Sequence, residues 1–186
     1  MKWCDVKRPR ATVLLLVLLL VLLLVLSRVV TAADNMRLYG VLVAEPCVIP
    51  PGQGEIQLDF GSIVDKELYQ NQRTLGQRFE LKLEECDLSL GNVVTITFTG
   101  IENPLLPGLL ALEASSEAKG IAIGLETLAG KRLPLGKPST KYDLQVGSNT
   151  LALKAYVQGE AKAIADRTIK RGTFRSVTAT FKLDYE

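Results

Sequence analysis

The strongest constraint on this chain is an alternation of apolar and polar residues with a period of two. In one run, Val94, Ile96 and Phe98 alternate with threonines. Apolar residues recur at every second position in strands that bury one face. The runs with this pattern are 55–60, 79–84, 94–99, 121–125, 151–157 and 177–185. Helical periodicity is nearly absent, so the pattern favours an all-β fold.

Turn-forming residues separate these runs. They stand at Pro50-Pro51-Gly52, Gly91-Asn92, Pro107-Gly108, Gly130, Gly136-Lys137-Pro138, Gly147-Ser148-Asn149 and Gly172. Short strands at this spacing are typical of a β-sandwich. We expect a polar connection over Asp65 to Gly76, and a loop over 159–171, although the alanines there also suit one helical turn. The phase changes between Leu83 and Cys86, which predicts a strand end at Glu84-Glu85 or a β-bulge.

The first 32 residues differ from the rest of the chain. Basic residues precede an apolar run from Ala11 to Leu26, which only Thr12 interrupts, and small residues follow it before Asp34. This order is typical of a secretory signal peptide that is removed after Ala32 or Ala33. The alternative is an uncleaved membrane anchor, but the run is shorter than the roughly 20 residues that span a bilayer.

Removal of residues 1–32 changes both the charge and the cysteine count. The chain of 186 residues has 22 Lys plus Arg and 20 Asp plus Glu, and the leader holds five of the former and one of the latter. The remaining chain has 17 Lys plus Arg and 19 Asp plus Glu, so its net charge is −2. This charge gives no indication of a nucleic-acid partner. Cys4 leaves with the leader, whereas Cys47 and Cys86 remain in an oxidising compartment. An even pair there predicts a disulfide.

The composition excludes several classes of active site. The chain has no histidine, which removes Ser-His-Asp and Cys-His nucleophile systems and histidine metal ligands. It also has no Cys-x-x-Cys pair to indicate zinc. Carboxylates are the remaining candidates: Glu84, Glu85 and Asp87 are clustered, and Asp59 and Asp65 are available. Because no motif positions a pair of them, we predict no catalytic site, no cofactor and no metal.

Four local motifs, in this order along the chain, resemble the pilins of the chaperone–usher pathway, close to those of type 1 and P fimbriae. They are Gly40-Val-Leu-Val-Ala-Glu-Pro-Cys47-Val-Ile, Phe79-Glu-Leu-Lys-Leu-Glu-Glu-Cys86-Asp87, Gly147-Ser-Asn-Thr-Leu-Ala-Leu-Lys-Ala-Tyr156, and Gly172 followed by Ala179-Thr-Phe-Lys-Leu-Asp-Tyr185-Glu186. The resemblance implies an incomplete immunoglobulin-like β-sandwich that lacks its final strand and is completed by donor-strand exchange. It also implies that Cys47 pairs with Cys86.

The resemblance further implies three parts and two sets of site residues. The parts are a signal peptide over 1–32, an N-terminal donor-strand extension over 33–44 and a pilin domain over 45–186. The residues expected on the donor face are Met36, Leu38, Gly40 and Leu42. The residues expected along the groove edge, where a chaperone binds first, are Gly172, Val177, Ala179, Phe181, Leu183, Tyr185 and Glu186. The terminal carboxylate of Glu186 resembles the group that basic residues of the chaperone anchor.

The expected function is that of a non-enzymatic structural subunit in an adhesive fimbria on a Gram-negative cell surface, reached through the periplasm. The implied partners are a periplasmic chaperone, an outer-membrane usher and neighbouring fimbrial subunits. The short segment before Gly40 and the sequence Ile49-Pro50-Pro51 favour a minor subunit. The alternatives are a pilus-terminating subunit, a secreted enzyme that uses carboxylates, and a sugar-binding tip adhesin. About 154 mature residues leave no room for the lectin domain of such an adhesin.

Overall fold

The computed structural model describes residues 9–26, 39–42, 44–176 and 178–186. The chain divides into two units, Met1–Leu42 and Val43–Glu186. In the first unit, the apolar run forms helix α1 (Pro9–Leu26), and the side chains from Val13 to Leu22 are exposed. Among the described residues, no helix combines the length and apolarity needed to cross a membrane. The signal peptide stays a prediction, and its two cleavage positions lie outside the described residues.

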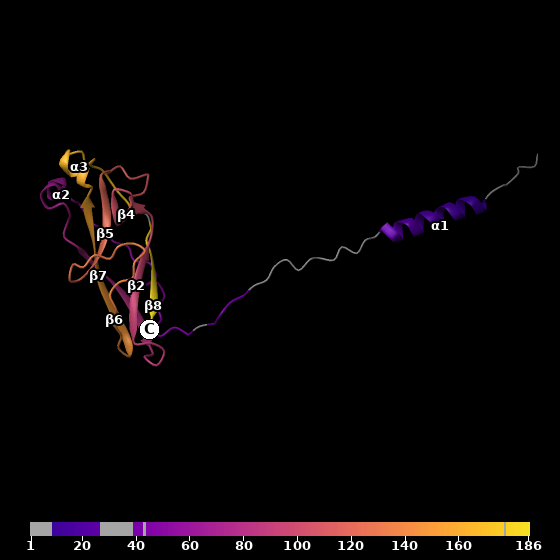
Figure 1. The fold of residues 1–186 in the computed structure, drawn as a ribbon, viewed down its shortest axis with the longest axis horizontal. Helices are drawn as coiled ribbons and strands as arrows, with labels where there is room; N and C mark the ends of the chain where they lie inside the picture. The colour runs from indigo at the N-terminus through magenta and orange to yellow at the C-terminus, as the bar shows by residue number, and fades with distance from the viewer. Residues whose placement is uncertain (1–8, 27–38, 43, 177) are drawn as a thin grey trace, which may run out of the picture. The chain divides into compact units, whose positions relative to one another are not determined.

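The second unit consists of two antiparallel sheets (Figure 1). The larger sheet has the strand order β1-β7-β5-β4-β3. Its strands are β1 (Gln77–Cys86), β7 (Gly147–Gly159), β5 (Ile121–Thr127), β4 (Leu106–Leu110) and β3 (Glu102–Asn103). The smaller sheet has the order β6-β2-β8. Its strands are β6 (Tyr142–Asp143), β2 (Val93–Thr99) and β8 (Thr180–Tyr185).

The main core is built from side chains of both sheets. Leu81 of β1 and Leu153 of β7 belong to the same buried cluster as Val94 and Ile96 of β2. On β1, buried positions alternate with exposed ones over most of the strand. Two sheets that share one core make a sandwich. The alternation therefore predicted β1, β2, β5 and β7 correctly.

The phase change before the second cysteine of the mature chain is a β-bulge. Leu83 pairs with Asn149, but the next pair joins Cys86 to Gly147, so β1 carries one extra residue there. Glu85 has a φ of 54°, in the left-handed region. The bulge turns the Cys86 side chain inward, where it is 3% exposed. One of the two alternatives for this site is thereby confirmed.

The prediction of a strand over 55–60 is wrong. Ile56, Leu58 and Phe60 are partly buried against the main core, as their alternation requires, but none of the described strands pairs with them. Alternation reports one buried face, whereas a strand also needs a hydrogen-bonded neighbour. The last alternating run is also shorter than expected, because β8 begins only at Thr180.

Two expected connections contain short helices. The polar connection over Asp65 to Gly76 holds helix α2 (Asp65–Asn71), which buries Leu68. Two acidic residues in the first turn of α2 suit the positive end of a helix dipole. The loop expected over 159–171 holds helix α3 (Ala161–Ala165), which is the single helical turn that the alanines also suited. Both helices are too short to be stable alone, so contacts with the sheets decide their formation.

Gly124 of β5 should tolerate no side chain. It pairs directly with Tyr156 of β7, and a Cβ at Gly124 would lie 2.2 Å from Cζ of that ring. Tyr156 is fully buried and the Arg73 guanidinium lies 3.6 Å over its ring, so the ring has little room to move. We expect Gly124→Ala to lower the free energy of unfolding by about 1–3 kcal/mol in urea denaturation. Gly54→Ala is the matched control: no atom lies within 4 Å of its added Cβ, and an effect as large as that of Gly124→Ala would contradict the packing argument.

Candidate functional site

Strand β8 is an edge strand that pairs, among the described strands, with β2 alone (Figure 1). Just beyond the end of β8, Glu186 and Val93 form a hydrogen-bonded pair. The N–H of Glu186 donates to the Val93 carbonyl at 3.0 Å, and the N–H of Val93 donates to the Glu186 main-chain oxygen at 3.2 Å. Bonded and non-bonded pairs alternate along an antiparallel ladder. The N–H and C=O groups of Phe181, Leu183 and Tyr185 therefore point away from β2. The open side of β8 offers three sets of backbone donors and acceptors.

The side chains of the same three residues face the core. Phe181, Leu183 and Tyr185 pack against the main cluster but are only partly buried. In the neighbouring strand β2, by contrast, Ile96 is 1% exposed. Burial raises the pKa of the Tyr185 hydroxyl, and the charge of Glu45 raises it further. An apolar row left half covered beside unpaired backbone is a surface suited to an additional strand.

Segment 55–64 contributes apolar side chains to the same part of the core. The ring centroids of Phe60 and Phe174 are 6.3 Å apart, so this segment reaches the stretch that leads into β8. The Gln77 side chain donates a hydrogen bond of 2.8 Å to the Asp59 carbonyl. Two segments that are not joined by a described ladder, 55–64 and 174–185, thus border one area of the core.

A pocket of about 190 Å³ is lined by residues from both sides of this area. Its floor consists of Leu68, Ala118 and Ile121, which are buried in a second core cluster. Two oppositely charged residues, Asp65 and Arg171, also line it. The floor has the chemistry to accept one apolar side chain.

Gly172 lies in the lining of this pocket and cannot be replaced without strain. Its φ is 144°, and an added Cβ would lie 2.5 Å from the Cβ of Glu117. The Glu117 carboxylate accepts hydrogen bonds from the backbone N–H and the hydroxyl of Thr173, both at 3.0 Å. These bonds lower the pKa of Glu117, the backbone bond most. Residues 172 and 173 are therefore held in place beside the pocket.

The predicted disulfide is present and lies at the other end of β8. Cys47 and Cys86 are bonded, with their Cα atoms 4.1 Å apart. Val48 and Glu84 exchange two backbone hydrogen bonds of 2.8 Å beside it. The main-chain oxygen of Glu186 accepts hydrogen bonds from Asn92 and Val93, while its side chain forms an ion pair with Lys141. The bridge fixes the start of the unit to the end of β1.

Comparison with known proteins decides the family. A family model described as fimbrial protein matches residues 36–186. The chain belongs to the fimbrial protein family. The Fimbria A protein of Serratia marcescens is 32% identical over 164 residues, which cover 86% of this chain and 91% of that protein. The major MR/P fimbria protein of Proteus mirabilis (strain HI4320) is 32% identical over 160 residues, which cover 83% of this chain and 87% of that protein.

Solved structures show the fold of this fimbrial chain. The crystal structure of the P pilus rod subunit PapA matches with a TM-score of 0.65 at 22% identity, over 76% of this chain and 100% of PapA. The prediction of an incomplete immunoglobulin-like sandwich is confirmed. Within this sandwich, β8 lies at one edge of the smaller sheet.

The predicted donor residues of the fimbrial chain are only partly described. Met36 and Leu38 lie outside the described residues, as does Val177 of the groove edge. Gly40 and Leu42 are described and exposed, and Leu42 is 101% exposed. Their assignment to a donor face stays a prediction.

Three of the carboxylates considered for an enzyme, Asp59, Asp65 and Asp87, have separate local partners. Asp59 accepts a hydrogen bond of 2.8 Å from the N–H of Gly61, and Asp65 is paired with Arg171. Asp87 accepts a bond of 2.9 Å from the N–H of Ser89, and hydrogen bonding with Ser89 lowers its pKa. The lowered pKa of Asp87 suits an ionised turn residue, whereas a general acid needs a raised pKa. None of these contacts brings two of the carboxylates together.

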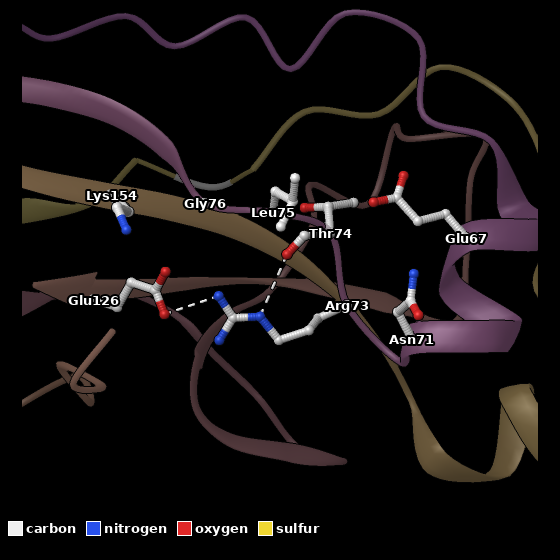
Figure 2. Close-up of a pocket in the computed structure, with 8 residues that line it drawn as sticks. All are labelled: Glu67, Asn71, Arg73, Thr74, Leu75, Gly76, Glu126 and Lys154. Carbon is white, nitrogen blue, oxygen red and sulfur yellow. Dashed lines mark hydrogen bonds and ion pairs between the residues drawn. The ribbon is translucent and has the colours of Figure 1, made fainter. Parts of the chain in front are cut away.

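Sequence reasoning missed a polar cleft of about 510 Å³ on the larger sheet (Figure 2). In it, Arg73 donates a hydrogen bond of 2.8 Å to the buried carboxylate of Glu126. The same guanidinium lies 3.6 Å above the ring of Tyr156. A paired charge stacked on an aromatic ring is a stabilising contact. Arg73 and Glu126 are 53 residues apart, so no local pattern could have indicated their contact.

Proposed function

We propose that this fimbrial structural subunit polymerises by donor-strand complementation. The observation that carries the proposal is the open side of β8, where Phe181, Leu183 and Tyr185 direct backbone groups outward and half-buried side chains inward. A strand added there completes the hydrogen bonding and covers the apolar row in one step. Strand addition is the known mode of chaperone–pilin complexes.

The donor is the segment 33–44 of a neighbouring subunit. Met36, Leu38 and Leu42 would fill the apolar area and the pocket, and Gly40 would pass where only bare backbone fits. Each large apolar side chain contributes about 1.5–3 kcal/mol when it is buried. The donor segment and the open edge are different surfaces of the same chain, so their contacts build a head-to-tail filament.

Before polymerisation the open edge needs a temporary partner, because an unpaired apolar edge promotes aggregation. We assign this role to a periplasmic chaperone, with delivery to an outer-membrane usher after removal of residues 1–32. The assembled fibre lies on the surface of a Gram-negative cell and supports adhesion. The assignment to a minor subunit stays a prediction.

Two variants test the donor and acceptor halves of this mechanism separately. Deletion of residues 33–42 should leave capture by the chaperone intact but prevent incorporation behind a preceding subunit. Phe181→Ser should reduce recovery of the chaperone complex, because it places a hydroxyl in the apolar row of the open edge. Co-purification with the cognate chaperone and incorporation into fibres are the two measurements. Unimpaired incorporation of the deletion variant would overturn the donor assignment, and unchanged recovery of Phe181→Ser would overturn the acceptor assignment.

A further inference from the structure

An ion pair joins the two sides of the pocket beside β8. The Arg171 guanidinium donates from Nε to Oδ2 of Asp65 at 2.8 Å, and its Nη2 lies 2.7 Å from the same oxygen. Asp65 is the first residue of helix α2, on one side of the pocket. Arg171 directly precedes Gly172, on the other side. Both residues line the pocket. We call this contact the rim ion pair.

The backbone around Arg171 is held independently of the rim ion pair. On the C-terminal side, Thr173 makes two hydrogen bonds of 3.0 Å to Glu117. On the N-terminal side, Lys170 and Lys119 exchange two backbone bonds of 3.1 Å. Loss of the ion pair should therefore free the Arg171 side chain without releasing the segment that carries it.

The rim ion pair lines the same pocket as an apolar floor. Leu68, Ala118 and Ile121 below it are each at most 5% exposed, and they offer contacts only to an apolar side chain. The ion pair gives such a side chain no favourable contact. It does connect the two sides of the pocket between which the donor strand would pass.

We infer that the rim ion pair must open when the donor segment of a second copy of this chain enters the pocket, and that it limits the rate of that entry. The inference rests on the proposed function, since it assumes the donor segment 33–44. The Arg171 side chain is 82% exposed and that of Asp65 is 21% exposed. Exposed pairs of this kind contribute little to stability, so the pair acts on the rate of strand entry more than on the stability of the domain.

The test is the rate at which a synthetic peptide of residues 33–44 displaces the chaperone from the chaperone–subunit complex. Arg171→Gln and Asp65→Asn should each accelerate chaperone release by about two- to fivefold, the range expected for loss of an exposed ion pair. The double variant should be no faster than either single variant, because both remove the same contact. Added salt should accelerate the wild type more than Arg171→Gln.

Lys162→Gln is the matched control. It removes another exposed ion pair, Lys162–Asp166 on and beside α3, whose Lys162 side chain is 84% exposed, and it should leave the rate unchanged. Rates that are unchanged or slower in the rim variants, or equally accelerated in the control, overturn the rim inference alone. Failure of the peptide to displace the chaperone from the wild-type complex overturns the proposed function, and the rim inference with it.

Discussion

Moving the donor segment to the other end of the chain should raise the melting temperature by about 15–25 °C. In this variant the chain starts at residue 45, and residues 33–44 follow Glu186 through a short hairpin linker. Met36, Leu38 and Leu42 then bury about 1.5–3 kcal/mol each against the open edge. One kcal/mol shifts the midpoint of a domain of this size by about 3 °C. Thermal unfolding followed by circular dichroism measures the shift against the chain of residues 45–186.

The control for this prediction carries the same appended segment with Met36, Leu38 and Leu42 replaced by serine. It keeps the length and the backbone groups but removes the apolar side chains, so it should gain only a small part of the increase. An equal increase in both variants would show that the apolar donor face contributes nothing. If the fused chain melts at the same temperature as the chain of residues 45–186, donor-strand complementation is contradicted.

Removal of the disulfide should lower the free energy of unfolding by about 4 kcal/mol. The bond closes a loop with a sequence separation of 39 residues, and the restriction that such a loop imposes on the unfolded chain accounts for this value. Cys47→Ala with Cys86→Ala is the test, measured by urea denaturation of the donor-fused chain. Reduction of the wild-type bond by dithiothreitol should produce the same loss. A loss below about 1 kcal/mol by both routes would contradict the assignment of a structural role to the bridge.

Periodicity predicted the central strands because burial on one face is a local property. The run around Ile96 alternates since its inner side chains meet the opposite sheet, and the phase break before Cys86 correctly indicated a bulge. The run 55–60 shows the limit of this reasoning. Its alternation is real, yet a strand also requires a partner, and partners are not encoded in a single run. Helix α2 was missed because seven residues with one buried leucine give too short a pattern.

The candidate site could be predicted only in part for the same reason. Alternation indicates which face of β8 is buried but not whether both of its edges are paired. The resemblance to pilins supplied that expectation, and the sheet order then placed β8 at an edge. The rim ion pair joins residues 106 positions apart. No local pattern relates Asp65 to Arg171, so this contact required the folded chain.

The most direct test of the account is amide hydrogen exchange at Phe181, Leu183 and Tyr185 in the donor-fused chain. Their N–H groups point to the open side of β8, whereas those of Lys182 and Asp184 point to β2. If the donor segment pairs with this edge, all five amides should be protected to a similar degree, and the serine control should lose protection at the three outward positions alone. Fast exchange at those three positions in a fused chain with a raised melting temperature would contradict strand addition at β8.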